Sequence, residues 1–451
     1  MKKVHFISIG GSVMHSLAIA LKKKGIEVSG SDDEIYSPSK EKLEKNGLLP
    51  KETGWHPEKL NNGLDAVILG MHAKENNPEL IKAKELGIPI YSFPDFIKEE
   101  SSNKQRIVIA GSHGKTTITG MIIHVLNHIG RKFDYLIGAD LNGLDNQIRL
   151  SDAPVIIIEG DEYLTSSLDR TPKFLKYEHH IGLISGISWD HINAFPTFEE
   201  YVHQFDIFGD ATPKAGSIIF CGDDNMATVI GTKERDDVNR LEYVTHPHKV
   251  VDGVTYLLTD KGDVKVSIFG KHNMQNIAGA QVLLKRIGVT DDQFYEAIQS
   301  FRNPWKRLQL LDASNTTSVY VDYAHSPSKV AATTKAAKEQ YKDRSLVACF
   351  ELHTFSSLNR DFIDQYQESL NDAEEAIIFI NPKNLKASSG LPFTDDEIQD
   401  AFAHPNLKIF MEIEKLKKAL LEKDWNNKNL LLMSSGNFAE MDAKELAKQI
   451  I

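Results

Sequence analysis

Short apolar runs alternate with amphipathic stretches along this chain of 451 residues. The first run, at 4–9, leads through two glycines into a stretch with helical periodicity from about residue 13 to 24. Several later runs are apolar on both faces, which is typical of parallel strands covered by helices. We expect further strands at 27–31, 66–69, 106–110, 155–158, 181–185, 216–220, 318–322, 346–350, 376–380 and 430–433, and a helix at 329–341.

Polar and proline-containing breaks divide this pattern into three blocks. A chain of this length exceeds one ordinary hydrophobic core, so two or three domains are expected from size alone. The polar run at 99–104 suggests a first linker, and Asn303-Pro304 marks a second break. Strand and helix alternate in every block and no short repeat is visible. The sequence therefore predicts three α/β domains, at residues 1–104, 105–302 and 303–451.

Composition and charge narrow the class of protein. The chain is 41% hydrophobic and 25% charged, and its net charge of -11 gives no basic footprint for nucleic acid or an anionic membrane. Cys221 and Cys349 are too few for a disulfide framework, so we expect both to be buried thiols in a reducing compartment. His5, Ser8 and Gly10 interrupt the first apolar run, which argues against a signal peptide. We expect a cytoplasmic enzyme without membrane insertion, acting on small molecules.

A glycine-rich segment between a predicted strand and a predicted helix gives the sharpest chemical signal. Glycines there let backbone N–H groups surround phosphates, and the helix that follows offers its positive end. Lys115 would reach the β- and γ-phosphates, and the Thr116 hydroxyl would bind Mg²⁺. Ile109 stands where the strict Walker motif has glycine, so this is a shorter variant, and a simple turn is the alternative. This phosphate loop comprises Gly111, Ser112, His113, Gly114, Lys115, Thr116 and Thr117.

Acidic residues follow the strand predicted at 155–158. Glu159 and its neighbours would lie at the carboxyl edge of the sheet, where α/β folds bind ligands. Asp190 and His191 come after the next strand, so Glu159 and His191 can converge on a metal ion held by phosphate oxygens. Taken singly, each of these residues could instead be a helix cap or a satisfied polar group.

The first glycine turn is a weaker signal. Ser8 and Val13 stand where the dinucleotide fingerprint has glycines, so a structural turn and a ligand-binding turn are equally compatible with Gly10-Gly11. Asp32, at the end of the second strand, could accept a ribose hydroxyl or cap a helix. Neither feature alone supports an NAD-dependent enzyme.

Several ordered motifs resemble those of the Mur ligases, ATP-dependent amide-bond enzymes of bacterial cell-wall synthesis. The resemblance runs over essentially the whole chain. It implies a Rossmann-like N-terminal domain, a central P-loop domain and a Rossmann-like C-terminal domain, which bind UDP-sugar, ATP with Mg²⁺ and the incoming amine in that order. The motifs are the phosphate loop, Glu159-Gly160-Asp161-Glu162, Asp190-His191, Gly270-Lys271-His272-Asn273 with Asn276, Lys306-Arg307-Leu308, and Asp322-Tyr323-Ala324-His325-Ser326-Pro327.

The resemblance also implies a role for individual residues. Lys115, His191 and Arg307 would be catalytic, Arg307 by reaching the γ-phosphate, although it could also be a surface residue beside Lys306 and Arg302. Thr116, Glu159 and His191 would bind metal. His272, Asn273 and Asn276 would bind the nucleoside side of ATP, or else simply begin a helix. Asp322 and His325 would complete the nucleotide site on domain closure, and the UDP-sugar would contact Gly10, Gly11, Ser12 and Asp32.

Within the family, the sequence is most similar to the branch that joins UDP-N-acetylmuramate to L-alanyl-γ-D-glutamyl-meso-diaminopimelate in peptidoglycan recycling. The branch that adds L-alanine to the same nucleotide sugar is the alternative. The segment at 350–356 lacks the arginine usual in the amine-site loop, and Thr354 leaves the identity of the amine open. Phe205 lies near the position of the family's carbamylated lysine, so we expect no carbamate. A P-loop switch or a non-catalytic UDP-sugar-binding protein is the rival class, and the oligomeric state stays open.

Overall fold

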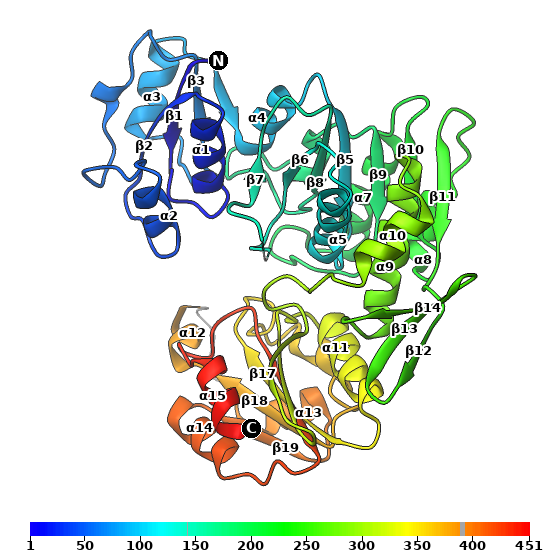
Figure 1. Cartoon of the computed structure of the whole chain (residues 1–451). Coiled ribbons are helices and arrows are strands. Elements are labelled where there is room, and N and C mark those ends of the chain that lie inside the picture. The colour runs from blue at the N-terminus through cyan, green and yellow to red at the C-terminus, as the bar shows by residue number, and fades with distance from the viewer. Residues whose placement is uncertain (142, 388–392) are drawn as a thin grey trace. The chain divides into compact units, whose positions relative to one another are not determined.

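The computed structural model describes residues 1–141, 143–387 and 393–451 (Figure 1). Packing divides these residues into two compact units. Unit 1 comprises Met1–Trp189, Asn193–Val244 and Gly279–Ala297, and unit 2 comprises Asp190–Ile192, Thr245–Ala278 and Ile298–Ile451. Each unit contains a mainly parallel sheet, and the two glycine turns, at residues 10–11 and 111–114, belong to unit 1.

The N-terminal part of unit 1 is a four-stranded parallel sheet in the order β2-β1-β3-β4. Successive residues of β1 and β3 belong to different cores, because side chains alternate between the two faces of a strand. Val4 and Phe6 pack with Leu17 of α1, whereas Ile7 packs with Leu80 of α3. The elements are β1 Lys3–Ile7, α1 Met14–Lys23, β2 Glu27–Ser31, α2 Ser39–Lys45, the 3₁₀ helix η1 Pro57–Lys59, β3 Ala66–Leu69, α3 Pro78–Glu85, β4 Ile90–Ser92 and α4 Phe93–Glu100.

The central part of unit 1 is a seven-stranded sheet in the order β11-β10-β9-β5-β8-β6-β7, parallel except for the β6–β7 pair. Strands β5 and β8 are direct neighbours, with Ile109 opposite Glu159. Their carboxyl ends therefore bring the phosphate loop and the acidic segment together. The elements are β5 Gln105–Ala110, α5 Lys115–His128, β6 Asp134–Leu136, β7 Ile148–Arg149, β8 Val155–Glu159, α6 Lys173–Lys176, β9 Ile181–Ile184, α7 Phe198–Asp210, β10 Ser217–Cys221, α8 Asn225–Gly231, β11 Asn239–Tyr243, the second half of α9 Lys271–Arg286, and α10 Asp291–Ile298. The first half of α9, up to Ala278, belongs to unit 2.

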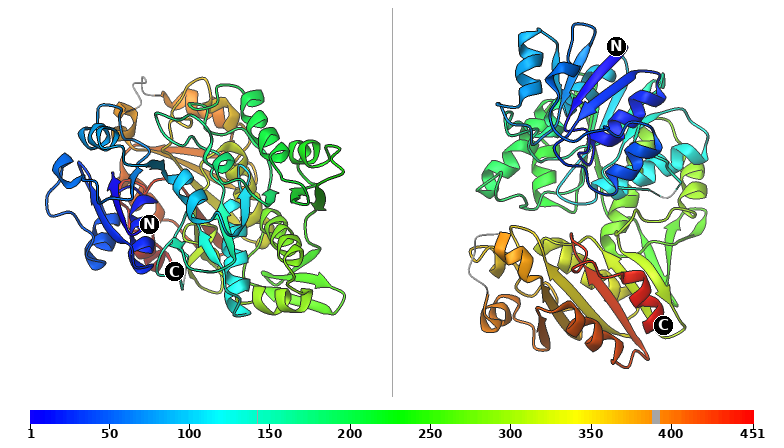
Figure 2. Two further views of the ribbon diagram at one scale, coloured as in Figure 1. Left: turned by 90° about the horizontal axis from the view of Figure 1, so that it is seen from above. Right: turned by 90° about the vertical axis from the view of Figure 1, so that its left-hand side faces the viewer.

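Unit 2 contains a three-stranded antiparallel sheet, β12-β13-β14, and a six-stranded sheet in the order β15-β16-β20-β17-β18-β19. The larger sheet is parallel except for the β15–β16 pair. Helices cover both of its faces (Figure 1; Figure 2, right). The elements are β12 His248–Val251, β13 Val254–Thr259, β14 Gly262–Val266, β15 Gln309–Ala313, β16 Ser318–Asp322, α11 Pro327–Gln340, β17 Ser345–Leu352, the 3₁₀ helix η2 Ile363–Tyr366, β18 Glu375–Ile380, α12 Pro382–Ala387, α13 Asp395–Phe402, β19 Leu407–Phe410, α14 Ile413–Leu421, β20 Lys428–Met433 and α15 Ala443–Ile450.

The alternation within the larger sheet of unit 2 shows why its strands read as continuous apolar runs. Tyr320 and Leu431 face the core that includes Val330 of α11. Val319 and Leu430 face the opposite core, which includes Leu416 of α14. Since both faces are buried, most positions in these strands are apolar.

The predicted strands and helices are present, with ends that differ by a few residues. Glu99 and Glu100, which we expected in the first linker, still belong to α4, and only 101–104 form a turn. The antiparallel sheet β12-β13-β14 was not predicted. It packs in unit 2, where Gln340 Nε2 of α11 donates to the Gly253 carbonyl at 2.6 Å. The compact units are defined by packing and the predicted domains by breaks in the sequence pattern, so the boundaries at 104 and 302 stay predictions.

Two simpler expectations can also be compared with the structure. Cys221 and Cys349 are buried free thiols, as predicted. Within residues 1–141, 143–387 and 393–451, none of the helices combines the length and the apolar character needed to cross a membrane.

Candidate active site

The phosphate loop connects β5 to α5 and requires glycine at two positions. Gly111 has φ +130°, and a Cβ there would lie 2.1 Å from Ser185 Oγ. Gly114, the N-cap of α5, has φ +81°. Residues with a side chain rarely adopt such backbone conformations, so glycine is needed where the chain turns into the helix. Ser112 N donates to the Gly186 carbonyl at 2.9 Å, and the Ser185 hydroxyl donates to the His113 carbonyl, which fixes the loop on β9.

Lys115 is held within this loop as a charged group. Its Nζ lies 2.5 Å from the Gly111 carbonyl and 2.6 Å from Glu162 Oε2. Burial alone would lower the pKa of Lys115, but the Glu162 carboxylate outweighs burial and raises it. Lys115 therefore stays protonated at neutral pH, in the first turn of a helix whose terminal N–H groups attract anions.

Thr116 and Glu159, both predicted as metal ligands, lie side by side. Thr116 Oγ1 donates to Glu159 Oε1 at 2.5 Å, and the Gly138 amide donates to Glu159 Oε2 at 2.6 Å. Hydroxyl and carboxylate oxygens are hard ligands, and Mg²⁺ usually completes such a site with phosphate oxygens and water. The donor set therefore fits Mg²⁺ bound together with a nucleotide. The described residues contain no group of three or more His, Cys, Asp or Glu side chains able to hold a metal by themselves.

Two residues that the sequence did not assign extend the network around Lys115. Glu162 is 2% exposed, and its Oε1 accepts a hydrogen bond from the Tyr201 hydroxyl at 3.3 Å. The Tyr201 hydroxyl also lies 2.8 Å from Ser112 Oγ. The acidic segment after β8 gave a signal for Glu162, but nothing local marked Tyr201, which comes from α7. Thr117 and Phe205 are buried, and Phe205 packs against Tyr201 with ring centroids 5.3 Å apart.

The N-terminal glycine turn is built around Asp32. Asp32 Oδ2 accepts a hydrogen bond from the Gly10 amide at 2.7 Å, and a Cβ on Gly10 would lie 2.9 Å from the same oxygen. Burial raises the pKa of Asp32 to about 6. Ser8 itself adopts φ +67°, the left-handed conformation that favours glycine. Asp32 is therefore not a helix cap but a buried carboxylate of the turn, next to Gly11 and the exposed Ser12.

In unit 2, the Asp190 carboxylate lies close to basic side chains of α11 and of the segment that precedes this helix. Lys329 Nζ of α11 lies 3.0 Å from Asp190 Oδ2, and His325 Nε2 lies 4.0 Å from it. The His191 amide donates to Asp190 Oδ1 at 2.8 Å, and His191 has φ +57°. Burial alone would raise the pKa of Asp190, but Lys329, His191 and His325 together lower it far below its usual range. Burial, reinforced by Lys329, lowers the pKa of His325 to about 4.

Arg307 lies in a segment with unusual backbone conformation. Lys306 and Leu308 both have positive φ, +53° and +44°. The Arg307 guanidinium lies over the Tyr323 ring, 4.6 Å from its centroid. Asp322 anchors the segment by accepting hydrogen bonds from the Leu308 amide at 2.5 Å and the Ala324 amide at 2.6 Å. Burial raises the pKa of Asp322, and the charge of Arg307 opposes this.

The two cations near Arg307 in the sequence, Lys306 and Arg302, have hydrogen-bond partners of their own. Lys306 Nζ binds the Gly436 carbonyl at 2.5 Å, and the Arg302 guanidinium hydrogen-bonds Ser267 Oγ. Each cation in the segment therefore has its own partner, and Arg307 is presented separately on the aromatic ring.

His272, Asn273 and Asn276 lie in the first turns of α9. Asn273 Nδ2 donates to the Phe269 carbonyl at 2.8 Å, and Asn276 Nδ2 lies 3.3 Å from Asn273 Oδ1. Gly270, with φ +89°, precedes the helix, and a Cβ there would lie 2.5 Å from Ala336. The helix start is thus confirmed, and a nucleoside contact by these residues stays a prediction.

The structure brings together Lys115, Thr116 and Glu159 in unit 1, and Asp190, His191 and His325 in unit 2. Because Glu159 and His191 belong to different compact units, their convergence on one metal ion stays a prediction. Lys329, which the sequence did not assign, is separated from Asp190 by 139 residues, and no local pattern could have revealed it.

Comparison with known proteins places these features in a family. Three family models match the chain: "Mur ligase family, catalytic domain" over 3–105, "Mur ligase middle domain" over 109–284 and "Mur ligase, glutamate ligase domain" over 306–436. A UDP-N-acetylmuramate–L-alanine ligase of Carboxydothermus hydrogenoformans is 31% identical over 389 residues, covering 84% of this chain and 82% of that protein.

Two further comparisons cover nearly full lengths. The UDP-N-acetylmuramate–L-alanyl-γ-D-glutamyl-meso-2,6-diaminoheptandioate ligase of Haemophilus influenzae is 27% identical over 99% of both chains. The crystal structure of the UDP-N-acetylmuramate–alanine ligase of Thermotoga maritima superimposes with a TM-score of 0.70 at 20% identity, covering 100% of this chain and 98% of that one. The chain therefore belongs to the Mur ligase family of ATP-dependent, amide-bond-forming ligases of peptidoglycan synthesis, and it has the three-domain α/β fold of that family.

Proposed function

We propose that this ligase joins the lactyl carboxylate of UDP-N-acetylmuramate to an incoming amine in the cytoplasm, with cleavage of ATP to ADP and phosphate. The phosphate loop carries the proposal, because a partly buried, protonated Lys115 and the Thr116–Glu159 pair lie at the carboxyl ends of adjacent strands. Domains 1–104, 105–302 and 303–451 would bind the UDP-sugar, ATP and the amine, respectively.

The chemistry requires activation of the carboxylate. A carboxylate is a poor electrophile at neutral pH because oxide is a poor leaving group. Attack of the lactyl oxygen on the γ-phosphorus of ATP releases ADP and forms an acyl phosphate. The amine then attacks the carbonyl carbon, loses a proton and expels phosphate, which leaves the amide.

The residues of unit 1 would bind and neutralise the triphosphate. Lys115 would exchange Glu162 for phosphate oxygens, and the loop amides would hold those oxygens in place. Mg²⁺, held by Thr116 and Glu159, would supply positive charge at the phosphates when bound. Gly10, Gly11, Ser12 and Asp32 would contact the UDP-sugar.

The residues of unit 2 would complete the reaction site. Arg307, a planar and permanently charged donor, would bind the transferred phosphoryl group. His191 would orient metal or phosphate, and Asp322 and His325 would support the same site. His272, Asn273 and Asn276 would bind the nucleoside.

L-alanine is the first candidate for the amine, because the relative of C. hydrogenoformans, 31% identical, carries that activity in its name. The diaminopimelate tripeptide is the second candidate. The H. influenzae relative named for it matches 99% of this chain. The segment at 350–356 lacks the arginine usual in the family's amine-site loop, so it does not favour one amine over the other.

The test is phosphate release from ATP and Mg²⁺ with UDP-N-acetylmuramate, comparing L-alanine with the tripeptide. Release that depends on one amine identifies it. Release without UDP-sugar would instead favour a P-loop switch or transport ATPase. If neither amine gives phosphate release, in protein shown to bind ATP, the proposal that UDP-N-acetylmuramate is the substrate is contradicted.

A further inference from the structure

At the carboxyl edge of the large sheet of unit 2, a buried carboxylate accepts hydrogen bonds from the described residues through only one of its two oxygens. Glu351, in β17, is 1% exposed. Its Oε2 accepts hydrogen bonds from Ser434 Oγ at 2.5 Å and from the Phe438 amide at 2.8 Å. Both partners lie in the segment that follows the neighbouring strand β20. One carboxylate oxygen thus anchors this segment.

The other oxygen, Oε1, is also buried, and no residue that the structure describes hydrogen-bonds to it. Ser435 Oγ, next to Ser434, is buried and likewise lacks a hydrogen-bond partner among the described residues. A buried polar group without a partner costs free energy, and such groups are rare in folded proteins. Two of them, at the ends of adjacent strands, indicate a ligand with hydrogen-bond donors.

The basic groups near Glu351 have other partners. His353 Nδ1 lies 3.9 Å from Glu351 Oε1 and only 2.9 Å from Asn384 Nδ2. Lys306 Nζ binds the Gly436 carbonyl at 2.5 Å, and burial lowers the pKa of Lys306 despite the nearby charge of Glu351. Neither side chain satisfies Oε1. The His353 side chain is 38% exposed, so Oε1 lies one side chain away from the surface.

We infer that Glu351 Oε1 and Ser435 Oγ accept a protonated primary amine of the amine substrate. This assignment rests on the proposed function, in which the C-terminal domain binds the amine. An ammonium group offers three N–H donors and a full positive charge, so it satisfies both oxygens and compensates the buried carboxylate. An anionic ligand would instead meet Glu351 as a like charge.

Two ammonium groups share this chemistry. One is the attacking amine, which L-alanine and the tripeptide both carry before it loses its proton. The other is the distal amine of the diaminopimelate residue, which only the tripeptide carries. Substrates that differ in the distal amine distinguish them.

Glu351→Gln is the sharpest variant. Its carbonyl oxygen can keep the hydrogen bonds to Ser434 and Phe438, while its NH₂ replaces Oε1 and turns an acceptor into a donor. We expect the KM for the amine to rise about tenfold or more, since charge-assisted hydrogen bonds are roughly twice as strong as neutral ones. The KM for ATP and the thermal unfolding midpoint should stay close to wild type.

The three amines to compare are L-alanine, the tripeptide and the tripeptide acetylated on its distal amine. A rise in KM for every amine in Glu351→Gln assigns the site to the attacking amine. If the distal amine binds there, acetylation raises the KM of the wild-type enzyme for the tripeptide. The Glu351→Gln variant then has the same KM for the free and the acetylated tripeptide.

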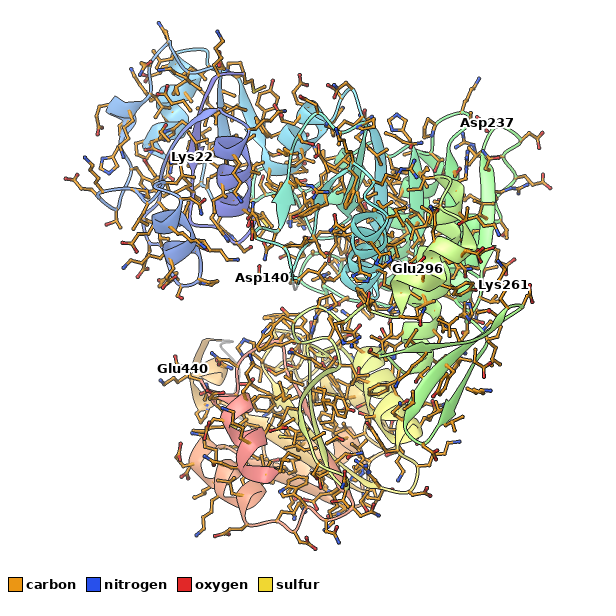
Figure 3. All side chains as sticks on the ribbon, in the orientation of Figure 1. Lys22, Asp140, Asp237, Lys261, Glu296 and Glu440 are labelled. Carbon is orange, nitrogen blue, oxygen red and sulfur yellow. The ribbon has the colours of Figure 1, made fainter. Side chains whose placement is uncertain are left out.

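Two further variants keep the test decisive. Ser435→Ala removes the second acceptor without touching the anchor, and we expect its KM for the amine to rise about threefold. Glu440→Gln changes an exposed carboxylate in the same segment (Figure 3) and should leave all constants unchanged. An unchanged KM for the amine in both Glu351→Gln and Ser435→Ala, in protein that turns over, would overturn the assignment. A wild-type protein that releases no phosphate with any amine would overturn the proposed function, and the assignment with it.

Discussion

Two buried carboxylates, one in each compact unit, are used in opposite ways. Glu162 in unit 1 is 2% exposed and lies 2.6 Å from the Lys115 ammonium. Glu351 in unit 2 is 1% exposed, yet its Oε1 has no hydrogen-bond partner among the described residues. A buried charge is costly unless it is paired. The protein itself supplies the partner of Glu162, whereas Glu351 is left with an oxygen for a ligand.

The difference extends to the surroundings of each carboxylate. Around the phosphate loop, Lys115 and Glu159 each have partners within unit 1. At the edge of the unit 2 sheet, Lys329 and His325 surround the single carboxylate of Asp190. Unit 1 therefore has a preformed site of paired charges, whereas in unit 2 Asp190 is paired but Glu351 Oε1 has no hydrogen-bond partner among the described residues.

Removing Lys115 tests the preformed site most strongly. We expect Lys115→Ala to lower phosphate release by about a thousandfold, because it removes a partly buried cation that would stabilise developing negative charge. Glu162 then loses its counter-ion, so the thermal midpoint should also fall, while the circular dichroism spectrum stays native. The exposed Lys132→Ala is the matched control. Phosphate release at the wild-type rate would remove Lys115 from phosphate binding.

Glu159 tests whether the same site holds the metal. For Glu159→Ala we expect the Mg²⁺ concentration at half-maximal rate to rise about tenfold to a hundredfold, since a carboxylate ligand or its close support is lost. A Mg²⁺ titration of phosphate release measures this. An identical titration curve in variant and wild type would exclude Glu159 from the metal site.

His325 tests the charge balance of unit 2 through pH. Its pKa of about 4 lies below the ordinary 6.5, so the unfolded chain binds a proton that the folded protein does not. The free energy of unfolding is therefore unaffected by the titration of His325 above pH 6.5, and it decreases as pH falls toward 4. In His325→Gln we expect this decrease in unfolding free energy to be smaller by about 2 kcal/mol. Thermal midpoints at pH 7 and pH 4.5 measure it, and an equal pH response in both proteins would contradict it.

Asp32, in unit 1, should change stability with pH in the direction opposite to His325, and this is the smallest effect that we expect. Its pKa of about 6 lies above the ordinary 3.8, so the folded protein binds the extra proton. The stabilisation is present below pH 3.8 and is lost as pH rises through 6. Asp32→Asn keeps an acceptor for the Gly10 amide, and we expect it to add about 1 kcal/mol at pH 8 and less at pH 5. A gain that does not change with pH would show that burial of the charge is not its cause.

The strands, the phosphate loop and the order of the motifs could be predicted because they are local. A continuous apolar run such as 106–110 identifies a buried strand, and the glycines that follow it identify the turn into α5. The antiparallel sheet β12-β13-β14 was missed, since its strands are partly exposed and its place in unit 2 depends on contacts with α11.

The sequence by itself determined that Lys115 and Thr116 begin a helix after a buried strand, because a strand, a glycine turn and a helix that follow one another in the chain depend mainly on local geometry. Only the tertiary structure decided which groups they meet. Lys329 reaches Asp190 across 139 residues, and Glu351 reaches Ser434 across 83. Sheet order places the ends of β17 and β20 together, and packing of residues 190–192 in unit 2 places Asp190 beside α11. Burial then determines which charges are paired and which oxygen is left for a substrate.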